Sequence, residues 1–227
     1  EGYNNAWRSV KIVDGIRVLR VKTYITANEG FLKRTLDYMS FMTSGSFFGL
    51  FETQPDLVVA TSPQFFTAIG GWALAKVKRV PFAFELRDLW PATILATGAM
   101  RRGRLIGALE RIEMFLYRQA DVVIPVTHAF KNDLVRRGID PDKISVVLNG
   151  VDLSKFQPRP TRDPEILEEL AIESRFVIGY LGTHGMCHGL EFAIEAAEKL
   201  RHEEGIVFLF VGAGAEKKKL QELVKLH

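Results

Sequence analysis

Hydrophobic positions along the chain alternate between strand periodicity and helical periodicity. Residues 10–25 alternate around Asp14-Gly15, which predicts a hairpin or a pair of strands. From residue 30 to 51, apolar residues recur every three or four positions, which predicts a helix. The pattern then predicts strands at 57–61, 80–86, 121–125 and 143–148, separated by helices at 63–78, 89–97, 104–119 and 129–137. Thr127 is predicted to cap the last of these helices. This alternation is typical of a parallel, doubly wound α/β sheet.

The segment Lys143–Pro158 interrupts this pattern and predicts a domain junction. Its strand ends in the turn Asn149-Gly150, and Pro158 and the following Pro160 stiffen the exit without starting a helix. We therefore expect domains at 1–156 and 157–227, with ligands bound in a cleft between them. Beyond the junction the pattern predicts helices at 164–170, 190–202 and 215–226 and strands at 176–181 and 206–211. Because two strands lack outer neighbours, we expect this second domain to be incomplete here.

Two apolar segments allow more than one interpretation. Residues 57–75 carry no charge, but Thr61–Gln64 interrupts them, which favours a strand and a helix over a membrane span. A cluster of Phe47, Phe48 and Phe51 ends the first predicted helix, and we expect it in the core, with a membrane-facing patch as the alternative.

The predicted helix 104–119 is amphipathic and has a basic edge. We expect one face to be buried, formed by Leu105, Leu109, Ile112, Phe115 and Leu116. Arginines flank that face at positions 101, 102, 104, 111 and 118.

The charge distribution and the cysteine count indicate which partners and which cellular compartment suit the protein. Residues 1–155 contain 21 Lys and Arg against 15 Asp and Glu, and residues 156–227 contain 9 against 12. The basic first part suits an anionic surface or substrate, or reflects ordinary variation in solvated faces. The single cysteine, Cys187, excludes an intrachain disulfide and suits a reducing, cytoplasmic compartment. No nucleic-acid partner is expected.

Gly182-Thr183-His184-Gly185 is a candidate phosphate-binding loop, since it lies between a predicted strand and a predicted helix. Glycines let a phosphate approach backbone N–H groups closely, although a plain strand-to-helix turn has the same composition. His184, Cys187 and His188 fall within five residues, but a structural zinc ion requires a fourth ligand that is not nearby. No metal is expected.

Gly212-Ala213-Gly214 imitates the start of a dinucleotide-binding fingerprint. Lys217 occupies the position of the third glycine, which disfavours a nicotinamide-dependent dehydrogenase. A close approach of this loop to a nucleoside or ribose remains open.

Glu85, Arg87 and Asp88 form a charged group at the carboxyl end of a predicted strand, where parallel sheets bind ligands. Alternatively, Asp88 caps the following helix and Arg87 pairs with a neighbouring carboxylate. Neither a G-x-S-x-G elbow nor a P-loop is present in the sequence.

Seven segments, taken in order, resemble GT-B glycosyltransferases of the retaining family-4 type. The resemblance is strongest to bacterial enzymes that build O-antigen, capsule and colanic acid. The segments are FLKRTLDYMSF (31–41), PDLVVATSP (55–63), VPFAFELRDLWP (80–91), LERIEMFLYRQADVVIPVTHAF (109–130), KISVVLNGVDLSKFQP (143–158), IGYLGTHGMCHGLEFAIEAA (178–197) and VFLFVGAGAEKKKL (207–220).

The resemblance implies two Rossmann-like domains. Residues 1–156 would be the acceptor-side domain without its first strand and Gly-rich loop, and 157–227 would begin the nucleotide-sugar domain. Arg87 and Asp88 would lie near the reacting sugar. The donor would be bound by Gly182, Thr183, His184, Gly185, His188, Gly212, Gly214 and Asn149.

The chain also departs from the pattern of this family. Arg87 stands where many relatives have a histidine, so no imidazole role is carried over to it. Thr183 and His188 stand where many relatives have an arginine and a lysine, so charge neutralisation must come from elsewhere or from protonated His188. The family's Glu-x7-Glu segment lies outside this chain, so we do not expect these residues alone to catalyse.

The function implied is hexosyl transfer, with retention, from a nucleotide-sugar, a UDP-sugar in the first instance, to a lipid-linked saccharide. No cofactor and no metal ion are expected. The basic helix and the phenylalanine cluster would then dock on the inner, anionic face of the plasma membrane. Two alternatives are a non-catalytic scaffold at the membrane and a nucleotide-sugar epimerase of the same fold.

Overall fold

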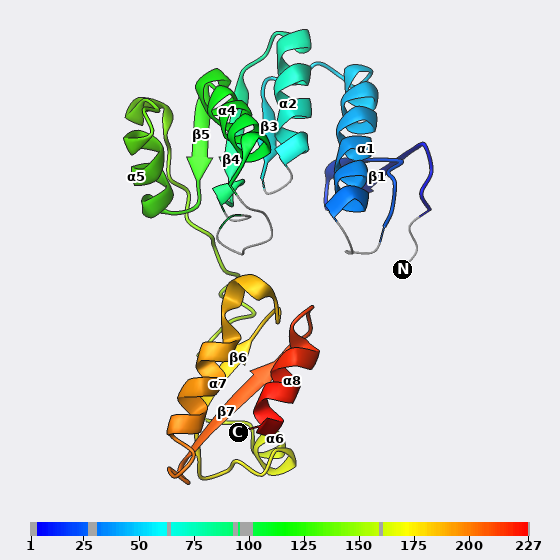
Figure 1. Cartoon of the computed structure of the whole chain (residues 1–227). Helices are drawn as coiled ribbons and strands as arrows, with labels where there is room; N and C mark the ends of the chain where they lie inside the picture. Colours follow the sequence, from blue (N-terminus) through cyan, green and yellow to red (C-terminus); the bar gives the residue numbers. More distant parts are fainter. Residues whose placement is uncertain are drawn as a thin grey trace. The chain divides into compact units, whose positions relative to one another are not determined.

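The chain forms two compact units, Glu1–Gly150 (unit 1) and Val151–His227 (unit 2). The computed structural model describes residues 4–26, 31–62, 65–92, 95, 102–158 and 161–226 (Figure 1). The division follows the predicted Asn149-Gly150 turn and precedes the boundary expected after residue 156. Residues 93, 94, 96 and 97 of the predicted helix 89–97 lie outside the described residues, as does Arg101.

Unit 1 begins with the predicted hairpin. Strands β1 (Arg8–Val13) and β2 (Ile16–Val21) pair antiparallel, with Val13 opposite Ile16. Asp14 and Gly15 between them both have positive φ, 51° and 79°. Two consecutive residues with positive φ are typical of the tight hairpin turn that an Asp-Gly pair favours. The hairpin prediction is confirmed.

The rest of unit 1 is a parallel sheet with connecting helices. Strands β3 (Val58–Thr61), β4 (Phe82–Leu86) and β5 (Val122–Pro125) lie in that order and pair in parallel. The helices are α1 (Phe31–Leu50), α2 (Phe65–Lys78), α4 (Arg104–Gln119) and α5 (His128–Arg136), followed by the 3-10 turn η1 (Pro141–Lys143). As predicted, the Thr127 hydroxyl caps α5 by accepting a hydrogen bond from the Phe130 amide.

The strand predicted at 143–148 does not form. Ile144 makes an isolated bridge to Val123, and the amide of Val147 donates to the carbonyl of Pro125 at 3.1 Å. Only Ile144 is buried in this segment, while Val147 and Leu148 are exposed. The β-branched residues that suggested a buried strand therefore run beside β5 without the burial that stabilises a ladder.

Strands β2 and β4 of unit 1 run in the same direction. Gly70 of α2 lies against Ser46 of α1, and Gly49 lies against Leu74, so the two helices run in the same direction. Helix α2 connects two parallel strands and therefore runs opposite to them. The Lys22 carbonyl meets Ser44, whereas the Tyr24 amide meets Ser40 one turn earlier, so β2 runs opposite to α1. Strand β2 consequently points the same way as β4.

Helix α4 is rotated relative to the prediction. Ile106, Leu116 and Tyr117 are buried, whereas the exposed residues include Leu105, Ile112 and Phe115. The rotation brings Glu113 into the interior, where its carboxylate accepts hydrogen bonds from Tyr117 Oη at 2.7 Å and from Arg137 of the following segment. The apolar periodicity of the sequence does not predict this arrangement. It assumes that only apolar residues are buried, whereas the buried face of α4 includes a charged residue with two hydrogen-bond partners.

Burial raises the pKa of Glu113, although hydrogen bonds from Arg137 and Tyr117 act in the opposite direction. Burial and the adjacent Glu113 carboxylate also raise the pKa of Tyr117. Arg137 packs against the Tyr117 ring, 5.9 Å from its centroid, and pairs with Asp133 at 3.6 Å. This group joins α4 to the end of α5.

Removing the arginine should leave a buried carboxylate without its charged partner. We predict that Arg137→Ala lowers the free energy of unfolding by about 3 kcal/mol in urea. Arg136→Ala is the matched control, because the Arg136 side chain is 77% exposed and pairs with the same Asp133; it should cost below about 0.5 kcal/mol. Equal losses from the two variants would contradict the account.

The phenylalanine cluster at the end of α1 is not in the core. Phe47 is 56% and Phe51 is 72% exposed, although the two rings contact each other edge to face at 5.2 Å. Core burial is therefore wrong for these two residues. The prediction failed because the hairpin, which lies beside this end of α1, covers only part of the cluster, and Arg8 and Arg17 of the hairpin pair there with Glu52.

Unit 2 is a smaller α/β unit. Strands β6 (Phe176–Leu181) and β7 (Ile206–Val211) pair in parallel. Its helical segments are α6 (Pro164–Glu169), the 3-10 turn η2 (Met186–His188), α7 (Leu190–Lys199) and α8 (Lys217–Leu226). Leu190, Ile194 and Leu220 form a small core between α7 and α8.

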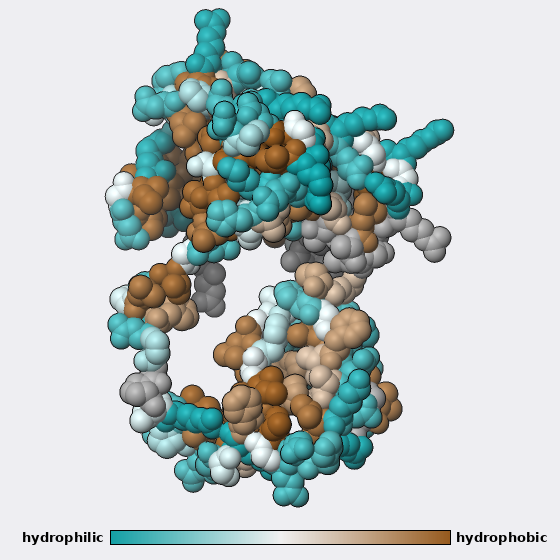
Figure 2. Space-filling model, turned by 90° about the vertical axis from the view of Figure 1, so that its left-hand side faces the viewer, coloured by the Kyte–Doolittle hydropathy of each residue, from teal (hydrophilic) through white to brown (hydrophobic). Residues whose placement is uncertain are grey.

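Apolar surface remains exposed on both units, as Figure 2 shows for one face of the molecule. The uncharged segment 57–75 forms β3 and α2, as predicted, rather than a span. Across the described ranges, no helix combines the length and the apolar character needed to cross a membrane.

Candidate functional site

In unit 1, the buried hydroxyl of Ser62 organises the carboxyl end of β4. Its oxygen accepts hydrogen bonds from the backbone amides of Arg87 at 2.9 Å and Asp88 at 3.2 Å. Ser62 follows β3 directly, so one neighbouring strand holds the turn that ends the next. The sequence analysis missed this residue, although a small hydroxyl residue directly after a parallel strand is a usable signal.

Arg87 and Asn149, two of the predicted site residues, meet in unit 1. The Arg87 guanidinium donates to Asn149 Oδ1 at 3.5 Å, across 62 positions of sequence. Both side chains are exposed, while Asp88 is half-buried. The unit therefore presents a cation, a carboxylate and an amide together at the carboxyl edge of its sheet.

In unit 2, the two glycine loops are joined by backbone hydrogen bonds. The amide of Gly182 donates to Val211 and the amide of His184 donates to Ala213, both at 2.9 Å. The carbonyl of His184 in turn accepts from Glu216 at 3.0 Å, just before α8. The loop after β6 and the loop after β7 thus form one assembly, although they are separated by about 30 positions in sequence.

Glycine is required at two points of this assembly because the chains approach so closely. A Cβ atom on Gly212 would lie 1.8 Å from the carbonyl oxygen of Gly182. A Cβ atom on Gly214 would lie 2.3 Å from the carbonyl oxygen of His184. The Gly-Ala-Gly sequence therefore serves loop packing here, whether or not a nucleoside also approaches it.

The loop contacts leave a defined set of backbone donors. Gly182 and His184 use their amides between the loops, whereas no hydrogen bond from the amides of Thr183 and Gly185 occurs within the described residues. Gly182 and Thr183 are exposed and Gly185 is half-buried. Helix α7 starts only at Leu190, after η2 and Gly189. The open donors therefore belong to the loop rather than to the first turn of α7.

The two histidines of the loop have different surroundings. His184 is 4% exposed, and neither ring nitrogen has a hydrogen-bond partner among the described residues. His188 is exposed, with Nδ1 at 3.2 Å from the Gly185 carbonyl oxygen and 3.7 Å from Cys187 Sγ. In the described part of the chain, no three His, Cys, Asp or Glu side chains are grouped as a metal ion would require.

Lys217 supplies a cation that the sequence analysis did not assign to the site. Its Nζ donates to the carbonyl of Gly212 at 2.9 Å, so the ammonium lies beside the two glycine loops. In the sequence, Lys217 appeared only as the residue that breaks the dinucleotide fingerprint. The nearby Lys219 is instead paired with a carboxylate, that of Glu216, at 2.8 Å.

The sequence also contains an Asp-x-Asp at Asp140-Pro141-Asp142. The Asp140 carboxylate accepts a hydrogen bond from the Asp142 amide at 3.0 Å and caps η1. The motif therefore has a local structural role at the end of α5.

Residues 1–150 match the model of the glycosyl transferase 4-like domain family. This range coincides with unit 1. The chain belongs to this family.

Two curated relatives from Escherichia coli support the same assignment. The putative colanic acid biosynthesis glycosyl transferase WcaI is 28% identical over 99% of this chain and 56% of its own length. The putative colanic acid biosynthesis glycosyltransferase WcaL is 30% identical over 49% of this chain and 26% of its own length. The chain thus spans about half the length of WcaI, and its match to WcaL covers about a quarter of that protein.

Solved structures show the fold. Anabaena Alr3699/HepE in complex with UDP has a TM-score of 0.64 and 16% identity, covering 85% of this chain and 50% of that one. The same protein in complex with UDP-glucose has a TM-score of 0.64 and 17% identity, covering 87% and 50%. The predicted fold class, α/β of the GT-B type with Rossmann-like parallel sheets, is confirmed.

The predicted site residues therefore fall into two groups within this glycosyl transferase 4-like chain. Unit 1 brings Arg87, Asp88 and Asn149 together around Ser62. Unit 2 brings the remaining predicted residues together in the joined loops, namely Gly182, Thr183, His184, Gly185, His188, Gly212 and Gly214. That the two groups act on one substrate stays a prediction.

The close approach of the loops yields a stability test. We predict that Gly214→Ala destabilises unit 2 by about 2 kcal/mol, because the new methyl group must displace the backbone of His184. Gly205→Ala is the control, since no atom lies within 4 Å of a Cβ at Gly205. Thermal unfolding of both variants measures the difference, and an unperturbed Gly214→Ala protein would show that the loops are not packed as described.

Proposed function

We propose that this chain is part of a retaining hexosyltransferase that uses a UDP-sugar and a lipid-linked saccharide acceptor in cell-surface polysaccharide synthesis. Family membership supports the transferase class, and the name of WcaI supports polysaccharide synthesis. UDP and UDP-glucose are the ligands in the HepE structures, which supports this class of donor. The observation that carries the proposal is the pair of joined glycine loops in unit 2.

In this proposal, the loop after β6 binds the donor diphosphate. The open amides of Thr183 and Gly185 donate to phosphate oxygens, as glycine-rich loops do in other phosphate sites. Lys217 supplies positive charge next to the loop, in place of the arginine and lysine expected there. His188 lies beside the same loop, with Nδ1 3.2 Å from the Gly185 carbonyl oxygen. The loop thus stabilises the leaving UDP, with no metal ion or cofactor assigned.

Arg87 and Asp88 are proposed to face the transferred sugar in unit 1. Ser62 fixes the turn that carries them, and Asn149 orients the guanidinium. A guanidinium remains charged at all physiological pH values, so Arg87 acts as a fixed hydrogen-bond donor and does not exchange a proton as a histidine would.

The cation beside the loop gives a direct test of donor binding. We predict that Lys217→Ala weakens UDP binding about tenfold in isothermal titration, since a charge-assisted contact to phosphate is lost. Lys218→Ala should bind as the unchanged chain does, because Lys218 is its exposed neighbour on the same helix. Binding that is absent for UDP, or equally affected by both substitutions, would refute the donor site.

Product analysis of a catalytically complete protein separates the proposal from its two alternatives. A transferase yields free UDP and a lengthened acceptor, while an epimerase yields an isomerised nucleotide-sugar. A scaffold yields neither product and retains any affinity for membranes.

We further propose that the exposed face of α4 docks on an anionic membrane surface. Leu105, Ile112 and Phe115 recur along this face, and Arg104, Arg111 and Arg118 are exposed on the same helix. Exposed apolar residues interleaved with arginines are typical of helices that lie in the membrane interface. Phe47 and Phe51, at the carboxyl end of α1, are exposed as well.

A charge on this face should prevent docking. We expect Ile112→Glu to abolish flotation of the chain with phosphatidylglycerol vesicles. Val135→Glu on α5 is matched, because Ile112 and Val135 are both 39% exposed on helices; it should float as the unchanged chain does. Failure of the unchanged chain to float would remove the docking proposal and leave donor binding unaffected.

A further inference from the structure

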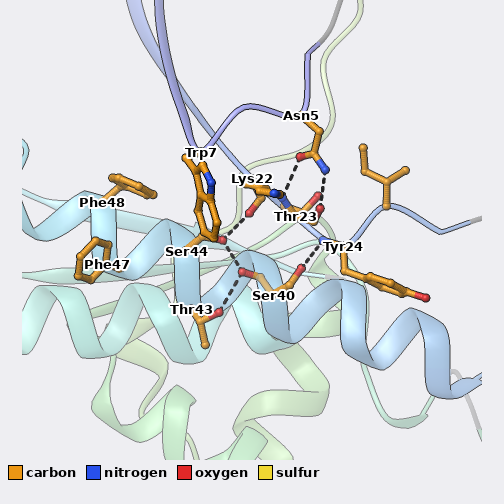
Figure 3. A pocket seen from close by; sticks show the side chains of 11 residues that line it. Asn5, Trp7, Lys22, Thr23, Tyr24, Ser40, Thr43, Ser44, Phe47 and Phe48 are labelled. Carbon is orange, nitrogen blue, oxygen red and sulfur yellow. Dashed lines mark hydrogen bonds between the residues drawn. The ribbon is translucent and has the colours of Figure 1, made fainter.

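A cavity of about 710 Å³ lies between the base of the hairpin and the middle of α1. This size suits a ligand of several hundred daltons. Figure 3 shows its residues: the rings of Trp7, Phe47 and Phe48 lie toward one side and Tyr24 toward the other. All eleven lining residues belong to the described part of unit 1. Nothing in the reasoning above assigns a ligand to this cavity.

The side chains of Asn5, Ser40 and Ser44 in the cavity wall already have hydrogen-bond partners. The Asn5 side chain bonds the backbone of Thr23 in both directions, at 2.8 and 3.1 Å. Ser40 Oγ accepts from the Tyr24 amide at 2.8 Å, and Ser44 Oγ donates to the Lys22 carbonyl at 2.7 Å. These bonds, drawn as dashed lines in Figure 3, fix the hairpin to α1. The surface left for a ligand is therefore largely aromatic and aliphatic.

One cation stands at this apolar surface. Lys22 Nζ lies 4.5 Å from the centroid of the Trp7 ring, and Trp7 is 70% exposed. Within the described residues, no carboxylate pairs with Lys22. This cation–π contact holds an ammonium group and an exposed indole together at the cavity, where a ligand with both an anionic and an apolar part could contact both.

Lys22 follows a strand that points the same way as the strand before the proposed sugar site. It comes directly after β2, and Arg87 and Asp88 come directly after β4.

We propose that this cavity binds the isoprenoid phosphate part of the lipid-linked acceptor. The phosphate contacts Lys22, and the first isoprene units lie against Trp7, Tyr24 and the phenylalanines of α1. This inference rests on the proposed function, which supplies a lipid-linked acceptor. A free saccharide suits the cavity less well, because its hydroxyl groups would find few unused hydrogen-bonding groups in the wall.

The test compares three probes by isothermal titration below their critical micelle concentrations. Farnesyl diphosphate contains chain and charge, farnesol contains only the chain, and inorganic pyrophosphate contains only the charge. We expect saturable, one-to-one binding of farnesyl diphosphate, at least tenfold tighter than binding of either other probe. A free oligosaccharide that binds as tightly as farnesyl diphosphate would overturn the proposal.

Two variants assign the binding to this cavity. Lys22→Gln should weaken farnesyl diphosphate binding about tenfold and leave farnesol binding unchanged. Lys11→Gln, which removes a lysine from the same hairpin away from the cavity, should change neither. Equal losses for the two variants would reveal a general charge effect and overturn the assignment.

Tryptophan fluorescence provides a readout that does not depend on Lys22. Farnesyl diphosphate should change the emission of the unchanged chain, and Trp7→Phe should remove that change while Trp72→Phe keeps it. An emission change that survives Trp7→Phe would locate the ligand elsewhere.

The outcomes separate this inference from the proposed function. Farnesyl diphosphate binding should persist in Lys217→Ala, since the donor loop is in unit 2. If UDP binds and farnesyl diphosphate does not, only the cavity assignment fails. If farnesyl diphosphate binds and UDP does not, the cavity remains a lipid-phosphate site and the donor proposal fails.

Discussion

Two backbone hydrogen bonds join the loops that follow the two strands of unit 2. The amides of Gly182 and His184 donate to Val211, the last residue of β7, and to Ala213 in the loop after it. These two amides are therefore not available to a ligand, whereas the amides of Thr183 and Gly185 are. Gly212 and Gly214 make this possible, since any side chain there would overlap the backbone of the first loop. The same contact brings Lys217 to the loop. The proposed donor chemistry thus depends on a packing constraint.

In unit 1, a side chain rather than a backbone group joins the ends of two neighbouring strands. The Ser62 hydroxyl, buried after β3, holds the amides of Arg87 and Asp88 after β4. On the other side of α1, Ser40 and Ser44 fix the hairpin and shape the cavity at Lys22. In both places a small hydroxyl residue sets the position of larger charged groups at the carboxyl ends of strands.

The sequence predicts local structure well where the signal is local. The Asp14-Gly15 turn, the Thr127 cap and the alternation of strands with helices depend on neighbouring residues, and all are found. The rotation of α4 could not be predicted, because it depends on the pairing of Glu113 with Arg137, 24 positions away. Phe47 likewise remains exposed because of how the hairpin lies on α1.

The candidate site residues show the same difference between local signals, which the sequence reveals, and contacts between distant residues, which it does not. Motifs identify the glycine loops and Arg87, but only the fold shows that Gly182 and His184 are occupied and that Lys217 is adjacent. Ser62 and Lys22 escape notice because each acts on residues that are distant in sequence. The sequence thus indicates which segments carry chemistry, and non-local contacts decide which atoms are available.

The availability of the Thr183 and Gly185 amides is the central claim, and amide NMR tests it directly. In a ¹⁵N-labelled chain titrated with UDP, the resonances of Thr183 and Gly185 should show the largest shifts. The amides of Gly182 and His184, already bonded to the second loop, should exchange slowly with solvent in the free protein. Largest shifts outside unit 2, or rapid exchange of Gly182 and His184, would contradict the account.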